Sequence, residues 1–403
     1  MEVRKVFLRL AALTKSTVLS VLCFFEAAFC IYSVRDVGFA DIWPTPYELY
    51  YFVRDDTSGE ILTSIRHISD TSFLDSNIEF RIINIDQNRD DPALEYIRFR
   101  ELESFPSAVL VSPWKQSLVI PLSPIDAPFS EYAWPIVEGI VSSPAREEIL
   151  RNIVRHYAVI VLVEGRDSTG NTRARKEIQS ARDEIKDAMS QMVQTIDAPP
   201  HTIVIGEESI SQERILLWSL EIHESELDDP CAAVFYGRGR RFGPTLRGDE
   251  ISRQNIYNLL TIIGLSCECG LDREQMTGMM IPLVWGPEIR SEVVKRLGFD
   301  AENPAVKLEM SQILALGSDP AAWAESGRGS SAVNFEEYNE FLLELGKRSG
   351  ASTISPAQLS DLATSGGRQN AALATALVIV GCLALLVITS GMIILLRRRA
   401  RTQ

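Results

Sequence analysis

The chain has 403 residues, 46% of them hydrophobic, which is enough for two or three domains with buried cores. Its formal net charge of -14 at pH 7 argues against nucleic acid as a partner held by bulk electrostatics. The four histidines are scattered singly, so we expect no metal centre built from histidines. No familiar nucleotide or hydrolase motif occurs in the central part of the chain, and the sequence indicates no cofactor.

The N-terminal residues 1–32 have the order of an export signal. A positively charged stretch, MEVRKVFLRLAALTK, is followed by an apolar one, STVLSVLCFFEAAFC, which ends in Ala-x-Cys. Glu26 interrupts the apolar stretch. Two interpretations stay open: a signal peptide cleaved near Cys30, which we favour, and an uncleaved signal anchor.

The C-terminal residues carry a membrane anchor. Residues 371–396 form an uncharged apolar run, and about 20 residues of helix already span the hydrocarbon core of a bilayer. Residues 397–403 are basic and, by the positive-inside rule, lie in the cytoplasm. Residues 349–370, small and polar, are typical of a flexible tether. The sequence therefore predicts a single-pass cell-membrane protein with an extracytoplasmic main part.

The central residues divide into two halves with the same order of elements. Apolar runs and amphipathic patterns predict the elements of the first half: a strand at 47–53, a helix at 61–74, a strand at 80–86, a short helix at 92–104 and a hairpin at 106–122. The second half repeats this order: a strand at 157–163, a helix at 172–192, a strand at 201–208, a helix at 213–227, a hairpin at 230–246 and a helix at 251–265.

This order resembles that of the thioredoxin family in both halves. The two hairpins have equal length, and each begins with a proline, Pro106 or Pro230. In that family this position holds a cis-proline beside the active site, so both residues are its candidates here. The resemblance implies an α/β fold with two tandem thioredoxin-like domains, residues 33–140 and 141–270, each a central mixed sheet flanked by helices.

Both halves depart from the family at the position that carries its activity. Family members have Cys-x-x-Cys at the start of the first helix, where the helix N-terminus lowers the thiol pKa. Here the two stretches read RDDTSGE (54–60) and EGRDSTGNT (164–172), without cysteine. Ordinary dithiol oxidoreductase chemistry is therefore excluded for both halves, and we name no catalytic residue.

Residues 271–348 form a helical extension, with helices expected at 287–297, 305–316 and 335–347. The run GMMIPLVWG (278–286) suits either a core or an adaptable partner surface, and we favour the core. Residues 36–53 suit an extra edge strand of the first sheet or a docking arm, and we favour the strand.

Three cysteines in the exported part leave three alternatives open. Cys231 could form a structural disulfide with Cys267 or Cys269, the thiols could be inert and buried, or they could do redox or soft-metal chemistry. We favour the disulfide.

Arginines crowd the turn of the second hairpin. Arg238, Arg240 and Arg241 alternate with glycines and could contact an anion or a partner. The favoured alternative is a solvated hairpin turn in which glycine supplies the positive φ.

Together these features predict a bacterial-type envelope protein with an export signal, two thioredoxin-like domains and one anchor. By resemblance to the non-catalytic modules of disulfide isomerases, we expect a scaffold or protein-binding module, associated with a transporter or an envelope-assembly complex. The alternative is an atypical thiol-redox or soft-metal protein that uses Cys231, Cys267 and Cys269.

Overall fold

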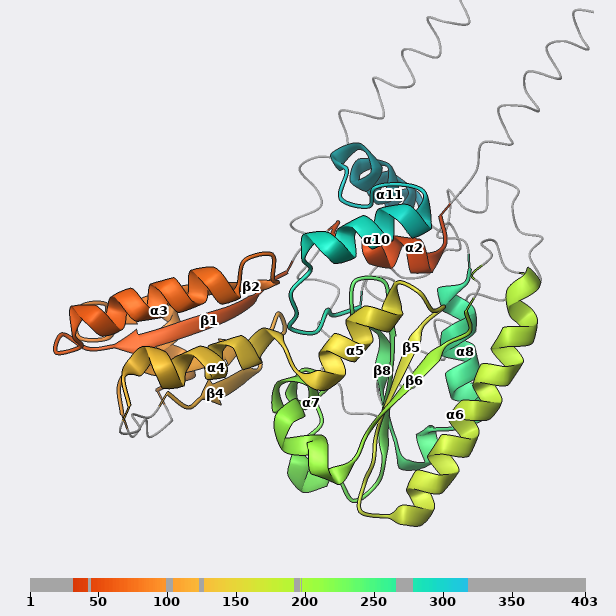
Figure 1. Cartoon of the computed structure of the whole chain (residues 1–403), viewed down its shortest axis with the longest axis horizontal. Coiled ribbons are helices and arrows are strands. Elements are labelled where there is room, and N and C mark those ends of the chain that lie inside the picture. Colours follow the sequence, from red (N-terminus) through yellow and green to blue (C-terminus); the bar gives the residue numbers. More distant parts are fainter. Residues whose placement is uncertain are drawn as a thin grey trace, which may run out of the picture. The chain divides into compact units, whose positions relative to one another are not determined.

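The structure, a computed structural model, describes residues 32–42, 45–98, 104–122, 127–191, 196, 198–265 and 278–317 (Figure 1). All of them belong to one compact unit. The predicted export signal, tether, membrane anchor and helix at 335–347 lie outside the described residues, as do Cys267 and Cys269. Within the described residues, no helix has the length and apolar character needed to cross a membrane.

The first domain contains one four-stranded mixed sheet with strand order β2-β1-β3-β4. β1 is parallel to β2 and antiparallel to β3, and β3 pairs with β4 as a hairpin. This is the order that the thioredoxin resemblance implied. The elements are β1 (Tyr47–Val53), α3 (Gly59–Ser72), β2 (Ile78–Asn84), the 3-10 helix η1 (Pro92–Tyr96), β3 (Ser107–Val111), β4 (Ser117–Ile120) and α4 (Phe129–Val141).

The side chains of the first sheet are divided between two cores. β1, with the sequence YELYYFV, is buried along almost its whole length, as expected for the inner strand of a mixed sheet. Its Leu49 and Tyr51 pack with α3 and α4, whereas Tyr50 and Phe52 face a smaller core that contains η1. The two helices therefore cover one face of this sheet, and Figure 1 shows them running alongside β1.

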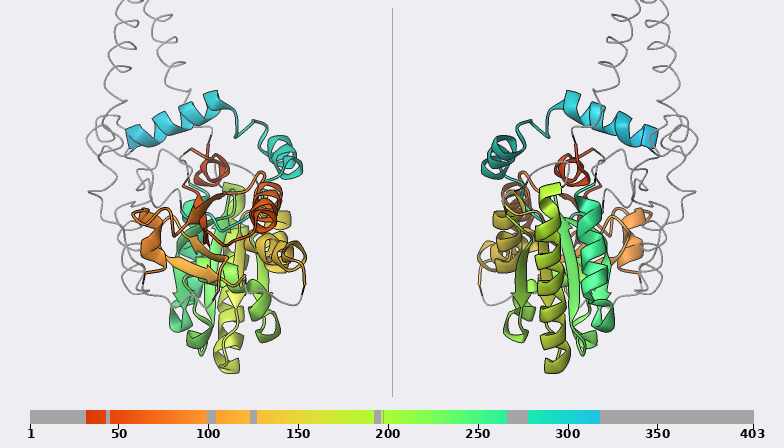
Figure 2. Two further views of the ribbon diagram at one scale, coloured as in Figure 1. Left: turned by 90° about the vertical axis from the view of Figure 1, so that its left-hand side faces the viewer. Right: turned by 90° about the vertical axis from the view of Figure 1, so that its right-hand side faces the viewer.

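The second domain repeats the arrangement with strand order β6-β5-β7-β8. β5 is parallel to β6 and antiparallel to β7. Figure 2 shows α6 and α8 side by side along the sheet. The elements are α5 (Pro144–Ile153), β5 (Val159–Val163), α6 (Ser168–Ala188), the 3-10 helix η2 (Met189–Gln191), β6 (His201–Ile205), η3 (Glu207–Glu213), α7 (Arg214–Ser219), η4 (Glu224–Glu226), β7 (Cys231–Tyr236), β8 (Arg240–Arg247), η5 (Gly248–Glu250) and α8 (Arg253–Ile263).

Several helices differ from the expectation. The helices α4 and α5 were not predicted from the sequence. The helix expected at 213–227 is broken after α7, because Glu221 has a φ of 61° and cannot continue a right-handed helix. The helix expected at 92–104 begins at Pro92, and among the described residues up to 98 it is a 3-10 helix that ends at Tyr96.

The extra edge strand expected within 36–53 was wrong for its N-terminal part. Residues 34–39 form the helix α2 (Val34–Phe39), which packs into the core of the second domain and not against the first sheet. Ser33 and Asp36 form a capping box that starts this helix. The Arg35 guanidinium then donates to the carbonyls of Ile153, Val154, His156 and Tyr157. These contacts fix the helix on α5.

The run at 278–286, here called the strap, lies in the core, which confirms the favoured interpretation. Met279, Ile281, Leu283 and Trp285 are buried. The strap pairs with both domains: Arg241 donates its backbone N–H to Met279, and Asn77 donates its backbone N–H to Leu283. It therefore ties the first domain to the second.

Arg146 is fully buried and bonds to groups from both domains. Its guanidinium donates to the carbonyls of Gly139 and Ile140, at the end of α4, and to the carbonyl of Pro282 in the strap at 3.1 Å. Burial lowers the pKa of Arg146 to about 10, while the nearby Glu213 carboxylate opposes that shift. One side chain thus joins α4, α5 and the strap.

Two helices follow the strap, α10 (Pro287–Leu297) and α11 (Pro304–Gly317). The first has the predicted bounds, because Pro287 suits the first helical position and Gly298, with a φ of 76°, ends the helix. Together with α2 they form a helical layer at one end of the second sheet (Figure 1).

Candidate functional site

In the first domain, the position that carries the cysteine pair in thioredoxins is an exposed polar loop. The loop follows β1 and comprises Arg54, Asp55, Asp56 and Thr57, and Ser58 caps α3 by accepting from the backbone N–H of Ile61. A helix N-terminus favours a hydroxyl or carboxylate cap. The polar side chains of this loop are therefore exposed to solvent and accessible to a partner.

Polar side chains from the ends of the two parallel strands converge beside this loop. Asn84 and Gln87 donate their amides to the Asp55 carboxylate at 2.8 and 2.6 Å. The backbone N–H of Asp55 in turn donates to Asp86 at 3.1 Å. This cluster was not predicted, although the carboxyl ends of adjacent parallel strands share one edge of a sheet and are a common place for binding groups.

The loop also contacts the start of the hairpin. The guanidinium carbon of Arg54 lies 4.6 Å from the centroid of the Phe105 ring, which is a cation–π geometry. The Phe105–Pro106 peptide bond is cis, as the resemblance implied for Pro106. We call Arg54, Asp55, Asn84, Gln87 and Phe105 the first-domain site.

In the second domain the equivalent position is filled by the chain itself. The backbone N–H groups of Arg166 and Asp167 donate to the carbonyls of Leu227 and Asp228, both at 3.0 Å. A side chain at Gly165 would collide with the backbone of Asp228 at 2.5 Å. This strand-like pairing occupies the place beside the start of α6.

Pro230 differs from the expectation, because the Asp229–Pro230 bond is not cis. The Pro230 carbonyl accepts the backbone N–H of Gly248, and the segment before it pairs with residues 166 and 167. These bonds hold the chain extended as it enters β7. Of the two prolines, only Pro106 therefore keeps the family geometry.

Cys231 lies at the start of β7 as a buried free thiol. Burial raises the pKa of the Cys231 thiol to about 11, although the Arg247 guanidinium near its Sγ acts in the opposite direction. The thiolate is the reactive form, so burial and the raised pKa lower the reactivity of this thiol at neutral pH. This observation weakens the redox alternative at Cys231.

The predicted partners of Cys231 lie outside the described residues, so their pairing stays a prediction. The carbonyl of Leu265, the last described residue before them, accepts the backbone N–H of Val34 in α2.

The arginines of the second hairpin are buried, so the prediction that they stay solvated was wrong, whereas Gly237 and Gly239 do have positive φ values, 55° and 67°. Contact of these arginines with an anion or a partner stays a prediction. Arg238, Arg240 and Arg241 are 8%, 5% and 5% exposed. Arg238 pairs with Glu302 and lies over the Trp285 ring, and Arg241 pairs with Glu221 at 3.2 Å.

Arg240 donates to the carbonyls of Gly38 and Gly278 and to Asp41 at 3.3 Å. Buried guanidinium groups need such partners because removing them from water is costly. Segments from before and after the domain supply the acceptors of Arg238 and Arg240, so these two arginines hold the N-terminal segment, the strap and the helical layer to the hairpin. Arg241 instead pairs within the domain.

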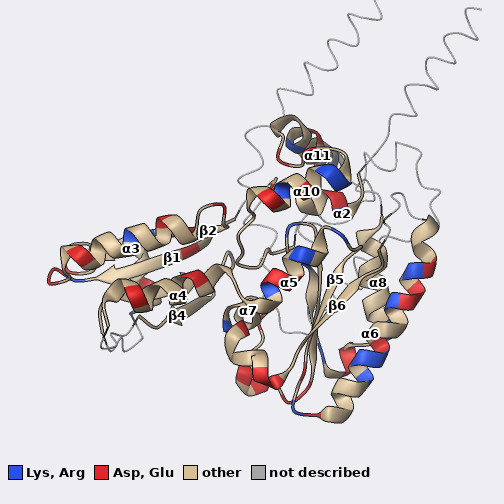
Figure 3. Cartoon of the chain, viewed as in Figure 1, with Lys and Arg blue, Asp and Glu red and all other residues tan. Residues whose placement is uncertain are grey.

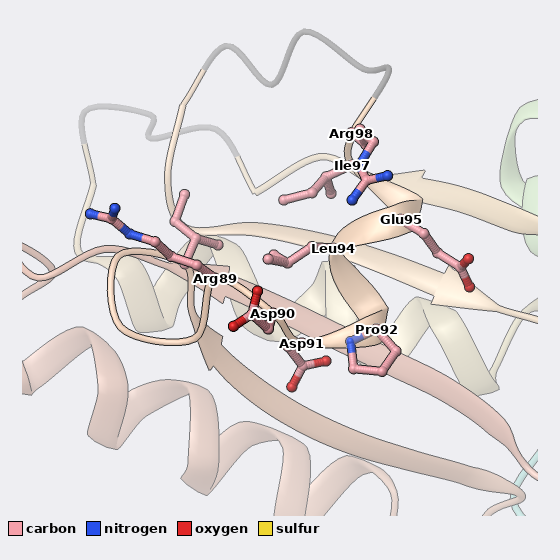
Figure 4. Close-up of a pocket in the computed structure, with 9 residues that line it drawn as sticks. Arg89, Asp90, Asp91, Pro92, Leu94, Glu95, Ile97 and Arg98 are labelled. Carbon is pink, nitrogen blue, oxygen red and sulfur yellow. The ribbon is translucent and has the colours of Figure 1, made fainter.

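A cavity of about 640 Å³ lies beside η1 in the first domain (Figure 4). The side chains of Arg89 and Glu95 point away from one another in this view, and Asp91 is already engaged by Arg81 at 2.9 Å. Charges of both signs line it without converging, so the cavity defines no ligand class. Its lining residues are Ile85, Arg89, Asp90, Asp91, Pro92, Leu94, Glu95, Ile97 and Arg98.

The fold that these strand orders define is a pair of thioredoxin-like α/β domains. Among the described residues, no three His, Cys, Asp or Glu side chains are placed to hold a metal ion. Acidic positions, red in Figure 3, occur on both α3 and α4, in keeping with the negative net charge.

Comparison with known proteins finds no matching family model and no matching curated protein. Among solved structures, the chain is similar to the zinc-bound form of human ERp44, with 9% identity, a TM-score of 0.19 and coverage of 59% of this chain and 61% of that one. It spans less than two thirds of that structure.

Two further structures are similar. The first two thioredoxin domains of Saccharomyces cerevisiae Eps1p match with 11% identity and a TM-score of 0.19, covering 58% of this chain and 98% of that one. A mutant of the alkylhydroperoxide reductase component AhpF from Enterococcus faecalis matches with 14% identity and a TM-score of 0.16, covering 50% and 86%. Values this low establish no relationship, and the fold assignment rests on strand order and register.

Proposed function

We propose that the protein is a non-catalytic, membrane-anchored binding module whose first-domain site contacts a protein partner outside the cytoplasm. The observation that carries this proposal is the contrast between the two helix N-termini. At α3 the exposed loop has charged groups of both signs beside an aromatic ring, whereas at α6 the side chains are also exposed but the backbone of Arg166 and Asp167 is already bonded to residues 227 and 228.

The chemistry of the helix N-termini supports binding over redox catalysis. Ser58 and Asp167 occupy the caps of α3 and α6, and neither is a nucleophile with a neighbouring base. The one described cysteine is buried with a raised thiol pKa. Exposed hydrogen-bonding groups around an aromatic anchor are typical of the contacts that proteins make with one another.

The rigid connection of the two domains suits a scaffold. Arg146 and the strap join them through buried hydrogen bonds, so a partner bound at the first domain would be held at a fixed place relative to the second. The membrane anchor at 371–396 would fix the module to the bilayer. A transporter or an envelope-assembly complex is the kind of partner that we propose.

Site-specific photocrosslinking in native membranes tests this proposal. A photoreactive residue in place of Asp56, which is exposed, should crosslink to a discrete partner. The matched control replaces Ser168, which is exposed at the equivalent place in the second domain. Equal crosslinking at both positions, or none at Asp56, would contradict the proposal.

A further inference from the structure

In the part of the chain that the structure describes, no strand pairs with the outer side of β2 from Ile78 to Ile82. β2 is the outer strand in the order β2-β1-β3-β4, and the residues expected to add a strand to this sheet form α2 in the second domain instead. An uncovered edge strand presents unpaired backbone groups and is a ready site for pairing with another strand.

The register identifies the groups that point outward. β1 pairs in parallel with β2, with Tyr47 opposite Ile78 and Val53 opposite Asn84. The Tyr47 N–H donates to Asn77 and the Ile85 N–H donates to Val53, so the odd-numbered residues of β2 bond to β1. The backbone groups of Ile78, Phe80 and Ile82 therefore face outward.

The sequence of this edge, IEFRI from Ile78 to Ile82, is self-complementary in charge. In an antiparallel pair of two copies centred on Phe80, Arg81 of one copy lies opposite the partner's Glu79, and the reverse pair follows by symmetry. Shifting the register by two residues places Arg81 opposite Arg81 or Glu79 opposite Glu79, which is destabilising. Charge thus selects one register.

The Glu79 and Arg81 side chains both reach solvent. Glu79 is exposed and makes no hydrogen bond or ion pair with the described residues. The Arg81 side chain is 56% exposed and already pairs with Asp91 at 2.9 Å, so in the dimer its guanidinium is shared between Asp91 and the Glu79 of the other copy. On the other face, a groove of about 370 Å³ is lined in part by Phe73, Leu74 and Phe80, and Leu74 is 70% exposed. Apolar contact can therefore accompany the ion pairs.

The strap limits the length of the paired segment. Its Val284 bridges Ser76, and its Leu283 accepts from Asn77, so the edge before Ile78 is already occupied. The Ile78 N–H is also taken by the Ser76 hydroxyl at 3.1 Å. The Phe80 N–H and C=O, the Ile82 N–H and the Ile78 C=O stay available, which allows four hydrogen bonds between two copies.

We propose that two copies of this chain associate through β2 in an antiparallel, two-fold pair centred on Phe80. The two first-domain sheets then form one continuous sheet, closed by reciprocal Glu79–Arg81 ion pairs. This association is separate from the proposed first-domain site, which is centred on the loop after β1 and includes from β2 only Asn84, beyond the paired segment.

Charge reversal tests the register. The full-length chain in detergent is measured by light scattering after gel filtration. Glu79→Arg alone and Arg81→Glu alone should each weaken dimerisation at least about 10-fold, because both ion pairs become repulsive. The double variant Glu79→Arg/Arg81→Glu should restore it, and an equal mixture of the two single variants should form a heterodimer. Melting temperatures confirm that the exposed substitutions leave the fold intact.

Disulfide crosslinking tests directly whether the two-fold axis of the dimer passes beside Phe80. Phe80→Cys should give a disulfide-linked dimer on mild oxidation, since hydrogen-bonded antiparallel pairs place Cα atoms about 5.5 Å apart. Ile82→Cys, the matched control, should not crosslink, and the wild-type chain gives the background from native cysteines. A monomeric wild-type chain, crosslinking of Ile82→Cys equal to that of Phe80→Cys, or dimerisation unchanged by single charge reversal would overturn the proposal.

Discussion

Replacing Arg146 by methionine should destabilise the protein strongly. The guanidinium donates to three buried acceptors, the Ile140 carbonyl, the Pro282 carbonyl and the Ser143 hydroxyl. Each buried acceptor that loses its donor costs about 1–1.5 kcal/mol, so the substitution should cost about 3–5 kcal/mol in the free energy of unfolding. The part-buried carbonyls of Gly139 and Ser142 can turn to water and add little.

Urea unfolding of the purified chain measures this cost, and amide hydrogen exchange locates it. Protection should fall at Ile281 and Leu283, because the strap loses its bond to Arg146. Arg151→Met is the matched control: it makes the same substitution on the exposed face of α5 and should cost less than about 0.5 kcal/mol. A cost below about 1 kcal/mol for Arg146→Met, or unchanged exchange in the strap, would refute the reasoning.

Two further predictions concern the second domain. Because burial raises the folded pKa of the Cys231 thiol to about 11 from its ordinary value of 9.0, its contribution of about 2–3 kcal/mol is complete below about pH 9 and is lost as the pH rises through 11. The loss of unfolding free energy between pH 8 and pH 11 should therefore be about 2–3 kcal/mol smaller in Cys231→Ala than in the wild-type chain. An equal loss in both proteins would contradict the raised pKa of Cys231. Gly237→Ala should cost more than about 2 kcal/mol, because φ is 55° and the new Cβ would lie 2.2 Å from Gly38. Gly298→Ala, with a φ of 76° and no atom within 4 Å of its Cβ, should cost only the backbone strain of about 1–2 kcal/mol, and equal melting temperatures for the two variants would count against the docking of α2.

The parts of the fold that local sequence determines were predictable. The runs of β-branched and aromatic residues in β1 and β5 predicted strands, and Pro287 and Gly298 lie at the two ends of α10. Both features act within a few residues of the chain.

The parts that depend on distant contacts were not predictable. Residues 34–42 alternate in a way that also fits a strand, and α2 forms because Arg35 finds the carbonyls of residues 153–157. The burial of Arg240 likewise depends on Asp41 and Gly278, which lie far away in the sequence. Only the tertiary fold brings these groups together.

The first-domain site falls between these cases. The resemblance was enough to infer that residues 54–60 lack the Cys-x-x-Cys pair of the family and that Pro106 is a candidate cis-proline. The convergence of Asn84 and Gln87 on Asp55 required the parallel register of β1 and β2. The hydrogen bonds from residues 166 and 167 to residues 227 and 228 could not be predicted, because no local sequence pattern indicates them.

The central claim is that this thioredoxin-like protein binds and does not exchange disulfides. Its most direct test is a turnover assay for disulfide exchange at neutral pH, with the purified full-length chain and a dithiol reductant. The account predicts the uncatalysed rate, both for this chain and for a variant with Cys267 and Cys269 replaced by serine. Turnover above background that disappears in that variant would contradict it.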